Sequence, residues 1–196
     1  MSALSPAYID AVMDGRSFEY AKQKLIKVLD WRARANPSSV TREDVNRQLV
    51  CGSLYWRGFD KRGRPVLYVR PAQKDYKRLD VEAEEKLHIL MLEFGLMHMP
   101  PGVTQFVIVA DAKGLKLQNL SLGLMKRLLK LVVTAYPDRL GTLYVTPVNL
   151  FVRAIFRAIK PLIKLAAKIH LVAKASALQG CLPTDSIPDF LGGTAS

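Results

Sequence analysis

The spacing of hydrophobic residues changes several times along the chain, and each change predicts a new element. Apolar residues three or four positions apart are typical of a helix with one buried face, and they favour helices at residues 16–34, 80–97, 121–135 and 147–160. A pair resembling a capping box, Thr41 and Asp44, predicts a further polar helix at residues 41–50. Short apolar runs favour strands at residues 54–56, 65–69, 104–110, 141–145 and 169–172. Because strands alternate with helices, we expect an α/β fold with a partly parallel sheet.

Local signals support several of these elements. The stretch GFDKRG at residues 58–63 joins the first two strands and is typical of a hairpin turn. The run TQFVIVA at residues 104–110 is rich in β-branched residues, which indicates a strand that is buried on both faces. Acidic residues in the first turns of the helix at 80–97 suit the positive end of its dipole. The sequence MPPG at residues 99–102 then ends that helix.

The helix predicted at residues 147–160 combines a wide apolar face with a regular series of cations. Its apolar side chains are Val148, Phe151, Val152, Ile155, Phe156 and Ile159. Its basic side chains, Arg153, Arg157 and Lys160, are four and three residues apart and therefore share the opposite face. Such a helix fits either an ordinary protein surface with a solvated basic face or the surface of an anionic membrane.

Charge is distributed unevenly over the 196 residues, which are enough for one domain with a full core. The formal net charge is +12, and residues 111–174 hold 12 Lys and Arg against 2 Asp and Glu. An excess of this size suggests an anionic partner, which can be a nucleic acid, an acidic membrane or an acidic protein. Aromatic residues are not interleaved with the basic ones and no nucleic-acid motif is present, so we expect no nucleic-acid partner.

Targeting signals and disulfides are not apparent in the sequence. The N-terminus has no basic start followed by an apolar run, and no apolar run reaches the ~18 residues of a membrane span. Two cysteines, Cys51 and Cys181, are too few for a disulfide framework. We therefore expect a cytoplasmic protein, monomeric and associated with membranes only at their surface.

Several stretches, taken together, resemble the CRAL-TRIO lipid-binding family. They are RSFEYAKQKLIKVLDWR, GFDKRGRPVLYVR, VIVADAKG, AYPDRLGTLYV, FRAIKPLIKLAAKIHL and the closing FLGG, and they occur in this order. That family includes phosphatidylinositol/phosphatidylcholine transfer proteins and the tocopherol transfer protein. The resemblance implies a short N-terminal helical region at residues 1–50 and a lipid-binding domain at residues 51–196. It also implies a mixed, mostly parallel sheet that floors an apolar cavity, with a mobile lid helix at residues 148–160.

A phosphoinositol headgroup site follows from the same resemblance, residue by residue. The family's polar positions match Arg16, Trp56, Asp60, Asp138 and Lys168. Two positions depart from the family's pattern, since Ser17 replaces a lysine and Ala166 falls where a threonine is usual.

The family's phosphatidylcholine site matches apolar residues in this chain. Leu67, Phe106 and Ile108 stand where relatives carry hydroxyl groups, which favours an apolar ligand or lipid tails over a choline headgroup. The resemblance adds Tyr144, Phe151, Ile155, Phe156 and Ile159 to the expected hydrophobic pocket.

A basic surface beside the lid is the third feature carried over, from the tocopherol transfer protein. It implies phosphoinositide contact by Arg139, Lys160, Lys164 and Lys168, and the basic face of the lid helix adds Arg153 and Arg157 to the expected membrane contacts.

Motifs of catalysis and metal binding are absent from the sequence. The three histidines lack the spacing of metal ligands, and there is no phosphate loop or nucleophile elbow. We therefore expect no enzyme and no metal. Haem is a minor alternative because some CRAL-TRIO proteins bind it, and Tyr144, His88 and His98 are the residues to consider. The favoured hypothesis is a carrier of one phospholipid, phosphatidylinositol first, and the alternative is a phosphoinositide-reading membrane adaptor without net transfer.

Overall fold

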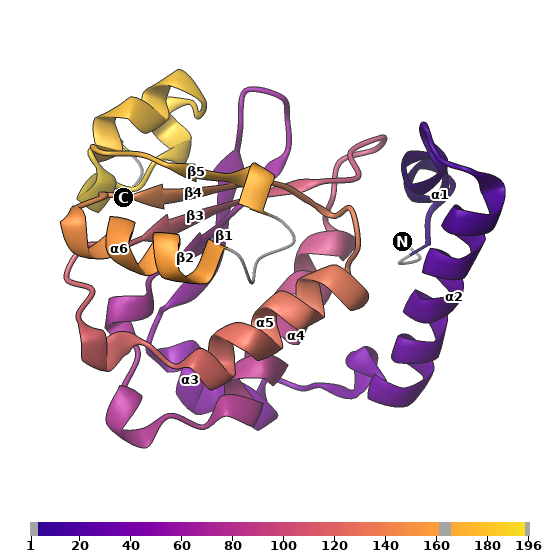
Figure 1. Ribbon diagram of the computed structural model, residues 1–196, viewed down its shortest axis with the longest axis horizontal. Helices are drawn as coiled ribbons and strands as arrows, with labels where there is room; N and C mark the ends of the chain where they lie inside the picture. The colour runs from indigo at the N-terminus through magenta and orange to yellow at the C-terminus, as the bar shows by residue number, and fades with distance from the viewer. Residues whose placement is uncertain (1–3, 161–165, 195–196) are drawn as a thin grey trace.

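A five-stranded mixed sheet forms the centre of the computed structural model, which describes residues 4–160 and 166–194 (Figure 1). The strands are β1 (Leu54–Phe59), β2 (Pro65–Val69), β3 (Phe106–Asp111), β4 (Leu140–Thr146) and β5 (Ile169–Leu171), and their spatial order is their chain order. The first pair is an antiparallel hairpin, and every later pair is parallel. The predicted α/β class with a mostly parallel sheet is thus confirmed.

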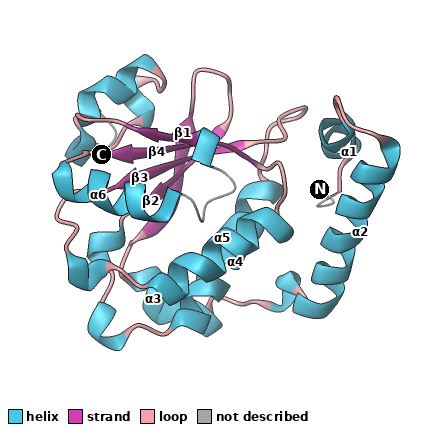
Figure 2. Cartoon of the chain, viewed as in Figure 1, coloured by secondary structure: helices cyan, strands magenta, loops and turns pink. Residues whose placement is uncertain are grey.

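The α-helices surround this sheet unevenly (Figures 1 and 2). Their bounds are α1 (Pro6–Met13), α2 (Phe18–Ala35), α3 (Asn46–Val50), α4 (Val81–Met97), α5 (Leu122–Thr134) and α6 (Leu150–Ile159). Helices α1 and α2 lie together at one end of the molecule, whereas α4 and α5 pack against one face of the sheet (Figure 1). None of the helices in the described part of the chain is long and apolar enough to cross a membrane.

The core has two layers because the central strands are buried on both faces, as predicted for residues 104–110. On one face Leu67 and Phe106 pack against Leu87 and Leu92 of α4 and Leu131 of α5. On the other face lie Val66, Tyr68, Val107 and Val109, covered by Leu178, Leu182, Ile187 and Leu191 of the C-terminal segment. Alternation along each strand sends neighbouring side chains to opposite layers.

Helix ends explain two differences from the predicted bounds. Helix α6 begins at Leu150, three residues later than predicted, because the Asn149 side chain accepts the Val152 backbone N–H at 2.9 Å and caps the helix there. The segment predicted as one helix at 41–50 is a short 3-10 turn followed by α3, although Thr41 and Asp44 do bond reciprocally. Helix α1 was not predicted. It packs on α2 through Tyr8, Val12 and Ala21.

Candidate functional site

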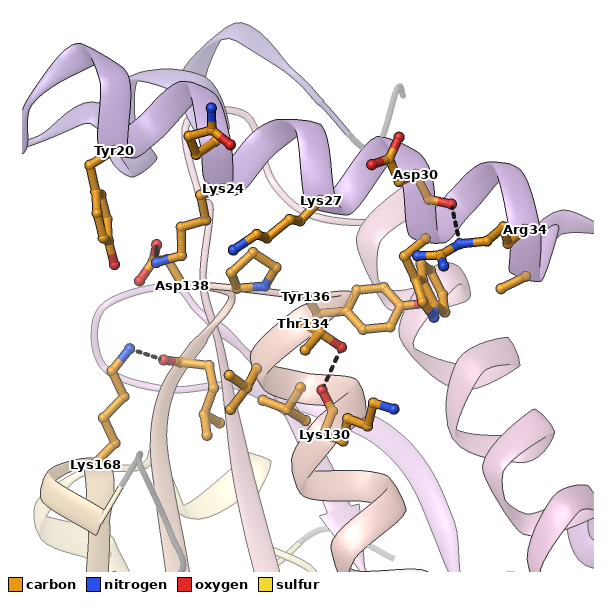
Figure 3. Close-up of a pocket in the computed structure, with 17 residues that line it drawn as sticks. Tyr20, Lys24, Lys27, Asp30, Arg34, Lys130, Thr134, Tyr136, Asp138 and Lys168 are labelled. Carbon is orange, nitrogen blue, oxygen red and sulfur yellow. Dashed lines mark hydrogen bonds and ion pairs between the residues drawn. The ribbon is translucent and has the colours of Figure 1, made fainter.

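A basic groove of about 920 Å³ separates α2 from the end of α5 and the start of β4 (Figure 3). Among the described residues that line it, five are basic (Lys24, Lys27, Arg34, Lys130 and Lys168) and two are acidic (Asp30 and Asp138). Lys24 and Lys27 extend from α2 toward the opposite wall, and Lys168 reaches up from the other side (Figure 3). Anions are therefore attracted to this groove.

Asp138 holds the N-terminal helices against the sheet. Its carboxylate accepts hydrogen bonds from Arg16 at 2.9 and 3.1 Å and from Lys24 at 2.8 Å. Burial by itself would raise the pKa of Asp138, but the hydrogen bonds from Lys24 and Arg16 outweigh it and leave the pKa below its usual value. Asp138 follows Pro137 in a left-handed turn with φ of 60°, a conformation that Asp and Asn tolerate better than other side chains.

Lys168 completes this cluster from the far side of the groove. Its ammonium donates to the backbone carbonyl of Leu140 at 2.6 Å. Burial lowers the pKa of Lys168, the Asp138 charge opposes that effect, and the cations Lys24 and Arg16 add to it. Three of the residues predicted for a headgroup, Arg16, Asp138 and Lys168, are therefore gathered in one place, and Lys24 joins them. The role of Lys24 could not be predicted from its position in the sequence. Only the packing of α2 brings its side chain to Asp138.

The other two predicted headgroup residues lie elsewhere. Asp60 pairs with Arg64 at 2.7 Å and accepts the backbone N–H groups of Arg62 and Arg64, so it stabilises the β1–β2 turn. The Trp56 indole N–H donates to the Met91 carbonyl at 2.7 Å, and its ring meets the edge of Phe106. Neither side chain lines the groove, so the structure gives both of them structural roles.

Arg139 is buried, and the prediction that it contacts a membrane is wrong. Only 4% of its surface is exposed. Its guanidinium lies 3.5 Å from the centre of the Tyr8 ring and donates to the Thr104 carbonyl at 3.1 Å. Burial lowers the pKa of Arg139 to about 10. This burial could not be predicted from the sequence, because Arg139 is covered by α1, a helix that the sequence pattern did not predict.

A second, smaller pocket of about 230 Å³ lies between α5 and α6. Its α6 wall consists of Val152, Ile155, Phe156 and Ile159, and its α5 wall includes Leu124, Met125 and Leu128. The basic residues of α6, Arg153 and Arg157, are exposed, as is Lys160 after it. The two-faced helix expected from residues 147–160 is thus present. Lys164 lies outside the described residues.

The residues expected on the cavity floor are packed core instead. Leu67 and Phe106 are fully buried beneath α4 and α5, and Ile108 packs beside them, so none of the three lines the pocket. Tyr144 points to the opposite layer of the sheet, and Phe151 lies off the pocket wall. These five positions were assigned by their match to family motifs. A motif match does not distinguish a residue packed under a helix from one that lines a cavity.

Polar side chains also line this pocket, and the sequence patterns did not single them out as a group. They are Lys74, Tyr76, His88, Asp111, Asn119 and Ser121. Glu84 and His88 are four residues apart on α4 and therefore share one helix face. This spacing was the one sequence feature that could have indicated a polar cluster here. The three residues considered for haem are not assembled, because His88 lines the pocket, His98 is exposed and Tyr144 faces the other layer. Among the residues the structure describes, no group of three His, Cys, Asp or Glu could hold a metal ion.

Known proteins resemble this chain in sequence, and a solved structure resembles it in fold. A phosphatidylinositol transfer protein of Eremothecium gossypii is 29% identical over 78% of this chain and 35% of its own length. A phosphatidylinositol/phosphatidylcholine transfer protein of Arabidopsis thaliana is 25% identical over 89% of this chain and 36% of its own length. The chain spans less than half of either relative.

Solved structures include one with the same fold. The crystal structure of Sfh5 superimposes with a TM-score of 0.73 at 20% identity, over 89% of this chain and 66% of that one. The sequence profile of the CRAL/TRIO domain matches residues 49–193. The chain is therefore a member of the CRAL/TRIO domain family.

Proposed function

We propose that this protein binds a single phospholipid, with phosphatidylinositol favoured, and exchanges it at membranes. The observation that carries the proposal is the convergence of Lys24 and Lys168 on one polar groove beside an apolar pocket, with Arg16 bound to Asp138 at the groove's edge. Two relatives whose names state phosphatidylinositol transfer add support.

The groove has unused donors for a phosphate. Each lysine ammonium has three N–H donors, and among the described residues Lys24 and Lys168 each donate one hydrogen bond. Arg16 can present its remaining donors to a phosphate oxygen while it keeps Asp138. The Asp138 carboxylate can accept from inositol hydroxyls. A choline cation would instead meet a groove with more positive than negative charge, so the site favours inositol over choline.

Helix α5 offers a route for the acyl chains. Its C-terminal half lines the groove through Lys130, Val132 and Val133, and its N-terminal half lines the apolar pocket through Leu124 and Leu128. A lipid whose phosphate sits in the groove would therefore lay its tails along α5 toward α6. The pocket of about 230 Å³ is below the ~300–1,000 Å³ of most ligand pockets. Full loading consequently needs α6 to move outward, as a lid would.

The outer face of α6 suits the surface of a membrane. Arg153, Arg157 and Lys160 are exposed there, and Leu150 beside them is 86% exposed. A cation near an anionic leaflet contributes about 1 kcal/mol to binding, and an exposed leucine can enter the interface. The cytoplasmic leaflet carries such anionic lipids and is the proposed place of exchange.

Vesicle transfer assays test this proposal. The wild type should move labelled phosphatidylinositol between vesicles faster than labelled phosphatidylcholine. Lys24→Gln and Lys168→Gln should each slow phosphatidylinositol transfer about tenfold, as expected for one charge-assisted bond to phosphate. Lys61→Gln is the matched control, because Lys61 is exposed on the β1–β2 turn away from the groove. Binding to vesicles without transfer of any lipid would refute the carrier and favour the membrane adaptor.

A further inference from the structure

The basic groove between α2 and α5 extends well beyond the cations proposed for the headgroup phosphate. Lys24 and Lys168 lie at one end, beside Asp138, whereas Arg34 and Lys130 lie at the other (Figure 3). Arg34 follows Lys24 by ten residues on α2, which corresponds to about 15 Å along the helix axis. A phosphate held by Lys24 and Lys168 therefore leaves the cations of the far end unused.

The far end of the groove has N–H donors on both of its walls. Lys27 and Arg34 belong to α2, and Lys130 belongs to α5. Among the described residues, the ammonium groups of Lys27 and Lys130 make no hydrogen bond or ion pair. Arg34 donates from Nε to the Asp30 backbone carbonyl at 3.1 Å, within its own helix, and its two terminal nitrogens have no partner there. A ligand between the walls can therefore accept hydrogen bonds from both helices.

The charge of this far end is unbalanced. Its three cations face one carboxylate of the described lining, Asp30, which gives a formal net charge of +2. Asp138, the other acidic residue of the lining, is already paired with Arg16 and Lys24. A phosphate monoester carries about −1.5 to −2 charges at pH 7. One phosphate group would therefore neutralise the far end almost completely.

The size of the groove suits a small ligand with more than one phosphate. Its volume of about 920 Å³ is near the upper end of the ~300–1,000 Å³ of most small-molecule sites. Between the two sets of cations, the ring of Tyr136 and the side chain of Pro137 contribute apolar surface on which a sugar-like ring can lie. No macromolecule is needed to account for the charge of the lining.

We propose that Lys27, Arg34 and Lys130 form a second phosphate subsite, and that the preferred ligand carries at least two phosphate groups on one inositol ring. Such a ring is supplied either by a phosphorylated phosphatidylinositol or by a free inositol phosphate. The inference rests on the headgroup site proposed above and makes its ligand more highly phosphorylated than phosphatidylinositol. The three side chains of the far end then determine specificity within that class.

Calorimetric titration with matched lipids tests the subsite. Dioctanoyl phosphatidylinositol and its 3-, 4- and 5-phosphates share the same tails and differ by one phosphate group. The wild type should bind the best of the three phosphates about tenfold more tightly than the unphosphorylated lipid, the effect of one additional hydrogen bond between charged groups. Equal affinity for all of these lipids would overturn the proposal.

Two variants at the far end localise the effect. Lys130→Gln and Arg34→Gln should each remove most of the preference, while the affinity for dioctanoyl phosphatidylinositol stays within about twofold of the wild type. Lys126→Gln is the matched control, because Lys126 is exposed on α5 one turn before Lys130 but does not line the groove. If both far-end variants kept the full preference, the second phosphate would lie elsewhere and the proposal would be wrong.

Free inositol 1,4-bisphosphate distinguishes the two sources of the phosphorylated ring. Binding as tight as that of the phosphorylated lipid would identify a soluble ligand, whereas binding more than about tenfold weaker would identify a lipid whose tails contribute. Either result supports the subsite. If hexaglutamate bound as tightly as the best phosphorylated probe, the groove would attract any polyanion, and that outcome would overturn the proposal.

Further outcomes separate this inference from the proposed function. A failure of the wild type to transfer phosphatidylinositol, beside an intact preference for a phosphorylated lipid, would refute the carrier alone. Normal transfer beside equal affinity for phosphorylated and unphosphorylated lipids would refute the second subsite alone.

Discussion

The ammonium of Lys24 lies 2.8 Å from a carboxylate oxygen of Asp138, a residue 114 positions further along the chain. The contact joins α2 to the turn before β4, and Arg16 bonds to the same carboxylate. One acidic residue thus ties α2 and the turn before it to the start of β4, and it fixes one cation of the groove, Lys24.

Asp138→Asn should destabilise the fold at neutral pH. Asn tolerates the left-handed turn but loses the charge that Arg16 and Lys24 share, so we expect a loss of about 1 kcal/mol in the free energy of unfolding. Because the pKa of Asp138 is lowered by folding, its contribution is complete above the unfolded value near 4 and disappears as the pH falls through the folded value. The difference from wild type in urea unfolding should therefore shrink from pH 7 to pH 3. Asp30→Asn, whose carboxylate makes no hydrogen bond among the described residues, should show no such trend.

Breaking the buried pair of Lys74 and Glu84 should be far more harmful than removing it. Lys74→Met or Glu84→Met alone leaves an unpaired buried charge, and each should lower the free energy of unfolding by about 3–5 kcal/mol. The double variant removes both charges and should recover most of that loss. Chemical denaturation of all four proteins completes the cycle, and additive effects of the two single variants would contradict the pairing.

Neutralising the exposed face of α6 should weaken binding to anionic membranes. At about 1 kcal/mol per cation, the triple variant Arg153→Gln, Arg157→Gln, Lys160→Gln should lose roughly 100-fold in affinity for vesicles containing phosphatidylserine. Sedimentation with vesicles measures this, and the wild type should lose affinity with added salt. A triple variant at Lys61, Lys113 and Lys116, also exposed, controls for net charge. Equal losses in both variants would mean that the orientation of α6 plays no part.

Gly95→Ala should destabilise the protein although alanine favours helices. A Cβ atom at Gly95 would collide with the indole ring of Trp56, and overpacking of this kind costs about 1–3 kcal/mol. Gly123→Ala in α5 is the control, because its nearest neighbour would be 3.8 Å away. It should be neutral or stabilising by up to ~1 kcal/mol. Thermal unfolding of the two variants should therefore shift in opposite directions or, at the least, differ clearly.

Local patterns were sufficient for most of the fold. The β-branched run at residues 104–110 and the two faces of the helix at 147–160 are written into single segments, so the sequence could predict both. Each depends on residues close together in the chain, and the structure places them as expected.

Contacts between segments far apart in the chain could not be predicted from the sequence. The motif predicted Arg139 at the surface, but Tyr8 of α1, more than a hundred residues away in the chain, covers its guanidinium. Trp56 and Asp60 matched headgroup positions by motif, but their polar atoms already have partners. The Trp56 indole N–H donates to the Met91 carbonyl, and the Asp60 carboxylate accepts from Arg64. His88 was considered only as a candidate for haem, because nothing near it along the chain indicates its contact with the Glu84 carbonyl or its place in the pocket wall.

The apolar inward side of α6 bears on where a bound lipid would be released under the proposed function. Any outward movement of the helix in water would hydrate Val152, Ile155, Phe156 and Ile159, and exposing partly buried side chains of this size costs roughly 5 kcal/mol in total. Hydrocarbon accepts the same side chains without that penalty. Under the proposed carrier function, the pocket would therefore open on the order of a thousand times less often in water than at a bilayer, and release of a bound lipid would be confined to the membrane surface.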